Sequence, residues 1–277
     1  MKLPGMGARR LPLRSWPRSI RRAGQVLCLW LLWGTSLSSG SASAQAAGFD
    51  NGQGAPNGTA EILSAEYTGP TTRYAHGVLG DAVEWSGLSL TLAGPNGTAM
   101  RVEIELPKDH VFEDLKPRLV DLSLDGRADA VMVVETDMAQ GAALALYGAD
   151  GKIAETPHIG QSNRWLAPIG AADLDGDGHV ELAYIDRPHL AKTLRIWRYD
   201  GRTLTEVASL PGLTNHRIGQ DFITSGIRNC ENGPEIVTVD ASWSRIMASR
   251  LTVAGIKTRD IGPFSGTQSV EDALTCE

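Results

Sequence analysis

Cysteine is scarce in this chain, with three residues among 277, and no two of them are spaced as C-x-x-C. That absence excludes a thioredoxin-type redox motif and a zinc ribbon, and the low count excludes a small scaffold held by many disulfides. Residues 45–277 also lack the G-x-S-x-G, H-E-x-x-H and G-x-x-x-x-G-K motifs. The sequence therefore marks no known class of enzyme, although a catalytic site assembled from distant residues remains an alternative.

Long hydrophobic runs are lacking too, because the apolar run Val26–Trp33 is too short to span a bilayer. Lys2 and six arginines precede the run without any acidic residue in residues 1–25, and Ala42-Ser43-Ala44 follows it. This pattern predicts a secretory signal peptide at residues 1–44, cleaved near Ala44, with an uncleaved anchor as the alternative. The predicted destination is periplasmic or extracellular, without a membrane span in the mature chain.

Basic residues are few once the predicted signal peptide is set aside. Residues 45–277 carry 19 basic and 32 acidic residues, a formal net charge of −13. Such a charge disfavours nucleic acid and anionic membranes as partners. Cleavage would also remove Cys28 and leave Cys230 and Cys276, for which we predict a disulfide in an oxidising compartment; two separate thiols are the alternative. Residues 45–60, rich in Gly, Ala, Asn and Pro, are predicted to be a flexible leader before one domain at 61–277.

Acidic residues, by contrast, are concentrated in one short loop. Carboxylates stand at its positions 1, 3, 5 and 9, as Asp173, Asp175, Asp177 and Glu181. Ca²⁺ takes six to eight oxygen ligands, and alternating Asp side chains can converge on one such ion. The run that follows, 181–185, has the pattern of a strand, which excludes the helix–loop–helix type of calcium site. The loop is predicted to bind Ca²⁺, the alternative being an Asp-Gly turn without metal.

The acidic loop belongs to a repeat. Its spacing recurs 52 residues earlier and, in degenerate form, about 54 residues later, where we predict that the metal is lost; the positions are Asp121, Ser123, Asp125 and Asp129, then Ile227, Asn229, Glu231 and Glu235. Turn dipeptides follow in phase, at Asn96-Gly97, Asp150-Gly151, Asp200-Gly201 and Ala254-Gly255. Such dipeptides between apolar runs indicate hairpins. We predict an all-β fold, a small or incomplete β-propeller of four to five blades with calcium loops, in which residues 61–68 complete the last sheet beside 246–261.

These loops and their spacing resemble the FG-GAP and VCBS repeat family, whose blades carry a D-x-D-x-D-G-x-x-D loop between two strands. The resemblance implies a binding or adhesion-like module, with Ca²⁺ as the cofactor that makes the blades rigid. It implies side-chain ligands at Asp173, Asp175, Asp177 and Glu181, with the carbonyl of His179 as a further donor. A weaker set is implied at Asp121, Ser123, Asp125 and Asp129, because Ser123 removes a charge and Arg127 is cationic. Glu181 departs from the family, which usually has Asp there.

A second group of candidates recurs at another phase of the repeat. Polar and aromatic side chains gather just before the strands that lead into the acidic loops, and could present a ligand platform at one end of the molecule: Arg73, Tyr74, His76, Asn163, Arg164, Trp165, Asn215, His216 and Arg217. Trp and Arg in such a place suit stacking and bidentate contacts. The alternative is that they cap strands or pack between blades. Trp85, Trp197 and Trp243 are predicted to be core residues.

Taken together, the sequence predicts an exported, calcium-binding, non-catalytic module that recognises carbohydrate or protein. Two alternatives stay open. One is an exported polysaccharide hydrolase or lyase with its site at the propeller mouth. The other is a structural subunit of an envelope complex, which a wide apolar patch on an outer blade would favour.

Overall fold

The computed structural model describes residues 60–230 and 232–276. The predicted signal peptide and, apart from Ala60, the predicted leader lie outside these residues. Seventeen strands, one short 3₁₀ turn and one helix, α1 (Thr267–Leu274), make up the described part, which confirms the all-β prediction. None of its helices is long and apolar enough to cross a membrane.

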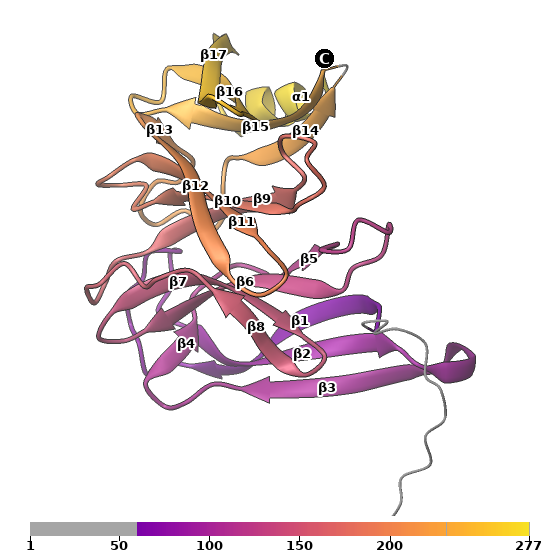
Figure 1. Ribbon diagram of the computed structural model, residues 1–277. Coiled ribbons are helices and arrows are strands. Elements are labelled where there is room, and N and C mark those ends of the chain that lie inside the picture. The colour runs from indigo at the N-terminus through magenta and orange to yellow at the C-terminus, as the bar shows by residue number, and fades with distance from the viewer. Residues whose placement is uncertain (1–59, 231, 277) are drawn as a thin grey trace, which may run out of the picture. The chain divides into compact units, whose positions relative to one another are not determined.

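Three antiparallel meanders of four strands form most of the fold (Figure 1). The first contains β5 (Arg118–Val120), β6 (Ala130–Asp137), β7 (Gly141–Gly148) and β8 (Gly151–Glu155). The second contains β9 (Leu166–Ala172), β10 (Glu181–Asp186), β11 (Thr193–Tyr199) and β12 (Leu204–Pro211). The third contains β14 (Gly226–Cys230), β15 (Gly233–Asp240), β16 (Arg245–Thr252) and β17 (Gly255–Pro263), and the two-residue β13 (Leu213–Thr214) also pairs with β15.

An N-terminal group of strands joins the first meander. It contains β1 (Ile62–Thr71), β2 (Glu84–Ala93) and β3 (Ala99–Glu105), and the short β4 (His110–Phe112) pairs with both β2 and β6. The predicted hairpin over Asn96-Gly97 is confirmed as the β2–β3 turn, and the dipeptides at 150, 200 and 254 likewise lie between strands β7 and β8, β11 and β12, and β16 and β17.

The predicted closure of a ring by residues 61–68 is wrong. Strand β1 pairs antiparallel with β2, in a register that sets Ile62 against Leu92. The physical reason is burial of the Ile62 side chain, which packs in one cluster with buried leucines of β2 and with Phe112. Strand β1 therefore pairs with β2, the next strand in the sequence. A propeller of four to five blades is not confirmed.

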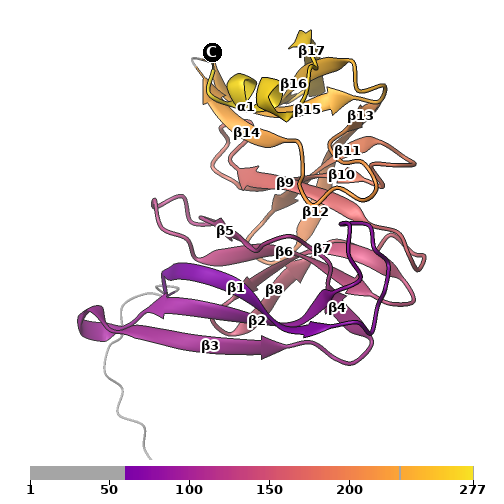
Figure 2. The same ribbon diagram turned by 180° about the vertical axis from the view of Figure 1, so that it is seen from behind.

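One hydrophobic core runs through all three meanders. Strands β6 and β7 are buried on both faces, because alternate side chains turn either to this core or to the cluster under β1 and β2. At the other end, α1 lies on the sheet of β14–β17, with Val270 packed against Val237, Val239 and Ile246 (Figures 1 and 2). The predicted disulfide between Cys230 and Cys276 joins β14 to the residues that follow α1.

Tryptophan packing follows the prediction. Trp197 is buried in the main core, while Trp85 and Trp243 pack against the clusters at the two ends.

Candidate functional site

The acidic loop 173–181 connects β9 with β10. Both oxygens of Asp173 accept backbone N–H groups, from Gly176 at 2.7 Å, Asp177 at 3.1 Å and Gly178 at 3.0 Å. Gly176 and Gly178 have φ angles of 79° and 86°, which glycine adopts without strain. Carboxylate oxygens of Asp173, Asp175 and Asp177 lie within 4.8 Å of one another, so the loop brings together the three aspartates that the sequence marked.

Arg198 of β11 reaches into this loop from the neighbouring strand. Its position is directly opposite Glu181. The guanidinium donates to Glu181 at 2.6 Å and to Asp175 at 2.7 Å, and lies 2.7 Å from an oxygen of Asp177. No motif in the sequence predicted this residue. The feature that could have indicated Arg198 is the register of the β10–β11 hairpin, which places a cation opposite Glu181, the last carboxylate of the loop.

The loop carboxylates differ in the number of hydrogen-bond partners that their oxygens have. Oδ1 of Asp175 is buried without a hydrogen-bond partner among the described residues. Glu181 is fully buried, accepts the N–H of Leu174 at 2.8 Å, and has a raised pKa because burial outweighs its contact with Arg198. Such oxygen donors fit a hard cation. A metal ion here would bind Oδ1 of Asp175 and would compete with Arg198 for the other carboxylate oxygens of the loop.

His179 lies on the exposed side of the loop. Its N–H donates to Asp177 at 3.0 Å, and its ring nitrogen Nδ1 lies 3.1 Å from the same carboxylate. The role of its carbonyl as a metal ligand stays a prediction.

The earlier loop, between β5 and β6, has the same hydrogen-bond pattern. Asp121 accepts the N–H of Gly126 at 2.7 Å, and Asp129 accepts the N–H groups of Leu122 at 2.7 Å and Ser123 at 3.1 Å. The cation nearest in sequence, Arg127, pairs with Asp125 at 2.5 Å. Strand β7, Gly141–Gly148, contains no arginine, so it offers this loop no counterpart of Arg198.

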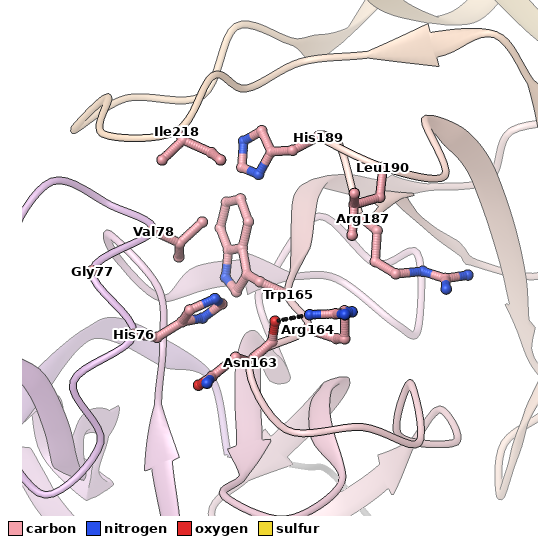
Figure 3. A pocket seen from close by; sticks show the side chains of 10 residues that line it. All are labelled: His76, Gly77, Val78, Asn163, Arg164, Trp165, Arg187, His189, Leu190 and Ile218. Atoms are coloured by element: carbon pink, nitrogen blue, oxygen red, sulfur yellow. Dashed lines mark hydrogen bonds between the residues drawn. The ribbon is translucent and has the colours of Figure 1, made fainter.

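A pocket of about 310 Å³ lies where three loops meet (Figure 3). The loops are the one between β1 and β2, the segment before β9, and the one between β10 and β11; Ile218 adds a fourth side. The residues that line it are His76, Gly77, Val78, Asn163, Arg164, Trp165, Arg187, His189, Leu190 and Ile218. Four of the nine predicted ligand residues, His76, Asn163, Arg164 and Trp165, are therefore brought together.

Two further candidates, Tyr74 and His216, contact residues that line this pocket. The hydroxyl of Tyr74 accepts the N–H of Asn163 at 2.8 Å, and the ring of His216 packs edge-on against Trp165, with centroids 4.9 Å apart. Asn163 has a φ of 54°, which an Asn tolerates better than most residues. These contacts fix the backbone and the indole at the pocket wall.

The other three candidates lie elsewhere and have structural contacts. Arg73 donates to the backbone oxygens of Pro107 and His110. Asn215 is fully buried and donates to Ser225 at 3.0 Å, and Arg217 lies 4.2 Å from the ring centre of Trp243. These three residues contact other parts of the protein and are not among the residues that line the pocket.

Trp165 is not an open stacking platform. Its side chain is 3% exposed, and its indole N–H donates to the carbonyl of Glu113 at 2.8 Å. The residue directly precedes the buried strand β9 and belongs to the main core. Only part of the ring reaches the pocket, where Figure 3 shows it between His76 and His189.

Glu113, which was not predicted from the sequence, contacts the pocket histidine His76. Its carboxylate is fully buried, lies 2.5 Å from Nδ1 of His76, and accepts the hydroxyl of Thr136 at 2.7 Å. Nearby, burial and the charge of Glu113 raise the pKa of Glu84 to about 9, so Glu84 is protonated at neutral pH. No motif marks Glu113, because its partner His76 lies 37 residues away in sequence.

The remaining wall of the pocket is apolar and weakly basic. His189 contacts His216 at 2.9 Å, and burial together with His216 lowers the pKa of His189 to about 4, so the ring is neutral at neutral pH. Arg164 donates to the carbonyl of Asn163 and forms no ion pair within the described residues. Leu190 and Ile218 are 66% and 72% exposed at the rim. The pocket therefore offers a cation and hydrogen-bond donors beside apolar surface.

Comparison with known proteins gives one finding about the family. Residues 121–184 match the FG-GAP-like repeat. No curated protein matches the chain. The matched segment begins at the first residue of one acidic loop and ends in β10, so it contains both loops and the start of the second meander. The chain thus carries an FG-GAP-like repeat over residues 121–184, consistent with the FG-GAP/VCBS-type repeat family.

Proposed function

We propose that the protein is an exported, calcium-binding and non-catalytic binding module of the FG-GAP type, an incomplete propeller that recognises carbohydrate or protein. The observation that supports this best is the pocket, because loops distant in sequence converge there on a cavity of about 310 Å³. Cavities of this size with a few polar groups in apolar walls are typical ligand sites. The disulfide between Cys230 and Cys276 is consistent with export.

The chemistry of the walls suits a ligand with both an anionic and an apolar part. Arg164 supplies a cation that has no carboxylate partner among the described residues, and His76 is oriented by Glu113. Leu190 and Ile218 supply apolar contact at the rim. An acidic sugar or a protein side chain can combine an anionic and an apolar part. A neutral sugar would bind best by stacking on an exposed aromatic ring, which Trp165 does not provide.

Calcium would be held by Asp173, Asp175, Asp177 and Glu181, with the carbonyl of His179, and a second ion by the loop at Asp121, Ser123, Asp125 and Asp129. The ion would supply charge neutralisation and a fixed loop geometry. Strand β9 links the later loop to the pocket, since it runs from Leu166, next to Trp165, to Ala172, next to Asp173. The loop residues thus fix one end of the strand whose other end forms the pocket wall.

The test is a binding screen with two matched variants. The wild-type chain, Arg164→Gln and Arg202→Gln are applied to an array of neutral and acidic oligosaccharides and of peptides. Arg202 is exposed and lies in the β11–β12 turn, away from the pocket residues in sequence and in the fold, so it controls for loss of charge. We expect binding that Arg164→Gln weakens by about tenfold, the value of one charge-assisted hydrogen bond, and that Arg202→Gln leaves unchanged. Equal binding by all three would place the ligand elsewhere.

A hydrolase or lyase remains a second candidate because of the pair His76 and Glu113. A buried carboxylate on Nδ1 leaves the other ring nitrogen for proton transfer, and His76 lines the pocket. In this alternative, His76 removes a proton from water or from the carbon next to a uronate carboxylate. The test is turnover of polygalacturonate by the wild-type chain and by His76→Gln. If the wild type degrades the polymer, and the variant loses this activity but still binds on the array, the reaction is favoured over binding alone.

A further inference from the structure

The third meander carries an unusual concentration of positive charge on its outer face. Side chains alternate along a strand, so Arg250 of β16 shares a face with Ile246, which packs under α1. Helix α1 covers one half of this face. The other half carries four cations, which we call the basic face: Arg228, Arg250, Lys257 and Arg259.

A single buried carboxylate organises the basic face. Glu235 is 4% exposed and accepts hydrogen bonds from Arg228 at 2.7 Å, Arg250 at 3.1 Å and Arg259 at 2.8 Å. The five side chains together carry a formal charge of +3. Arg228 is itself 9% exposed and also donates to the carbonyl of Ala273 in α1. The arginines are therefore held in place before any ligand arrives.

Lys257 adds a fourth cation to the basic face. Within the described residues it forms no ion pair, and the register of β16 and β17 places it directly opposite Arg250. Like charges in that position destabilise a sheet. Glu235 accepts a hydrogen bond from Arg250 and offsets part of this repulsion, and an oxyanion bound beside Lys257 would offset more of it.

The basic face is also hollowed. A cavity of about 300 Å³ is lined by Glu235, Arg250, Lys257 and Arg259 together with Asn232, Ala248 and Thr258. Ala248 pairs with Arg259 and leaves room above the sheet because its side chain is small. The described residues that line it include no aromatic ring on which a nucleobase could stack.

We infer that the basic face binds the carboxylate or sulfate groups of an acidic polysaccharide. Guanidinium groups match such oxyanions bidentately, and Arg259, whose side chain is 57% exposed, still has N–H groups directed to solvent. The neighbouring disulfide at Cys230 is consistent with an exported chain, which meets polysaccharides rather than nucleic acid. This site is separate from the pocket, and it stands whether or not the pocket binds a ligand.

The test measures binding of the full chain to heparin, polygalacturonate, neutral dextran and a single-stranded oligothymidylate. The variant is Lys257→Gln with Arg259→Gln, and the matched control, Lys108→Gln with Arg202→Gln, removes the same charge at two exposed positions away from the basic face. We expect heparin or polygalacturonate to bind, the basic-face variant to lose at least about tenfold in affinity, and the control to change less than about twofold. Heparin alone would identify sulfate, and polygalacturonate alone would identify carboxylate.

Three results would overturn the inference: no binding of either acidic polysaccharide, equal losses in variant and control, or oligothymidylate binding as tight as that of the polysaccharides. Thermal unfolding of each variant shows whether it folds. If the double variant unfolds at a lower temperature than the wild type, the single variant Lys257→Glu replaces it in the binding test. Lys257 is suited to this because it is exposed and forms no ion pair in the described part of the chain.

Discussion

Arg198→Gln tests how the acidic loop at 173–181 is neutralised. The substitution removes contacts of 2.6–2.7 Å to Asp175, Asp177 and Glu181. Among the described residues, the buried carboxylate of Glu181 then keeps only the N–H of Leu174 as a donor. Loss of a buried ion pair costs about 3–5 kcal/mol, and exposed pairs contribute about 0–1 kcal/mol. Because Arg198 is 25% exposed and Glu181 fully buried, we expect a loss of about 2–4 kcal/mol in a chelator.

In a domain of this size that loss corresponds to a midpoint about 4–16 °C lower. Calcium should reverse much of it, because the ion replaces the guanidinium on the same oxygens. At a Ca²⁺ concentration one hundred times the dissociation constant, binding to the folded state adds about 2.7 kcal/mol. Thermal unfolding of the wild-type chain, Arg198→Gln and the control Arg202→Gln, each with chelator and with millimolar Ca²⁺, should therefore show the largest calcium shift in Arg198→Gln. An unchanged midpoint in chelator, or a calcium shift no larger than that of the wild type, would refute competition between Arg198 and the ion.

Three further predictions concern stability. Glu84→Gln should stabilise the fold increasingly between pH 5 and pH 9, because the folded pKa of Glu84 is raised to about 9 and its unfolded pKa is near 4.5; below pH 4.5 both states are protonated and the variant should match the wild type in urea unfolding. Gly141→Ala should destabilise by about 1–3 kcal/mol, since its φ is 80° and a Cβ would lie 2.3 Å from the carbonyl oxygen of Gln161; a midpoint equal to that of the wild type would exclude this clash. Replacing Cys230 and Cys276 by Ser should cost about 3–4 kcal/mol by the chain-entropy model for a separation of 46 residues, and reductant should then have no further effect on unfolding.

Local chemistry explains what the sequence predicted. Asp-Gly and Asn-Gly dipeptides specify tight turns, so the hairpins at Asn96, Asp150 and Asp200 could be placed from a few residues. The convergence of Asp173 with its neighbours could be predicted for the same reason, because three of its hydrogen bonds stay within five residues of chain.

Long-range pairing explains what the sequence did not predict. The choice of β1 to pair with β2 depends on which partner buries Ile62, and the sequence contains apolar strands at both places. Arg198 and Glu113 act on residues 17 and 37 positions away, so their roles depend on strand register and on the meeting of loops. The recurring phase of Asn163 and Asn215 indicated a shared environment, yet Asn215 is buried whereas Asn163 lies at the pocket.

The array measurement of wild-type chain against Arg164→Gln tests the central claim most directly, because Arg164 lines the pocket and forms no ion pair in the described residues. The account predicts a carbohydrate or peptide that the wild type binds, that Arg164→Gln binds about tenfold more weakly, and that Arg202→Gln binds as the wild type does. Binding of the same ligands with equal affinity by all three chains would contradict it.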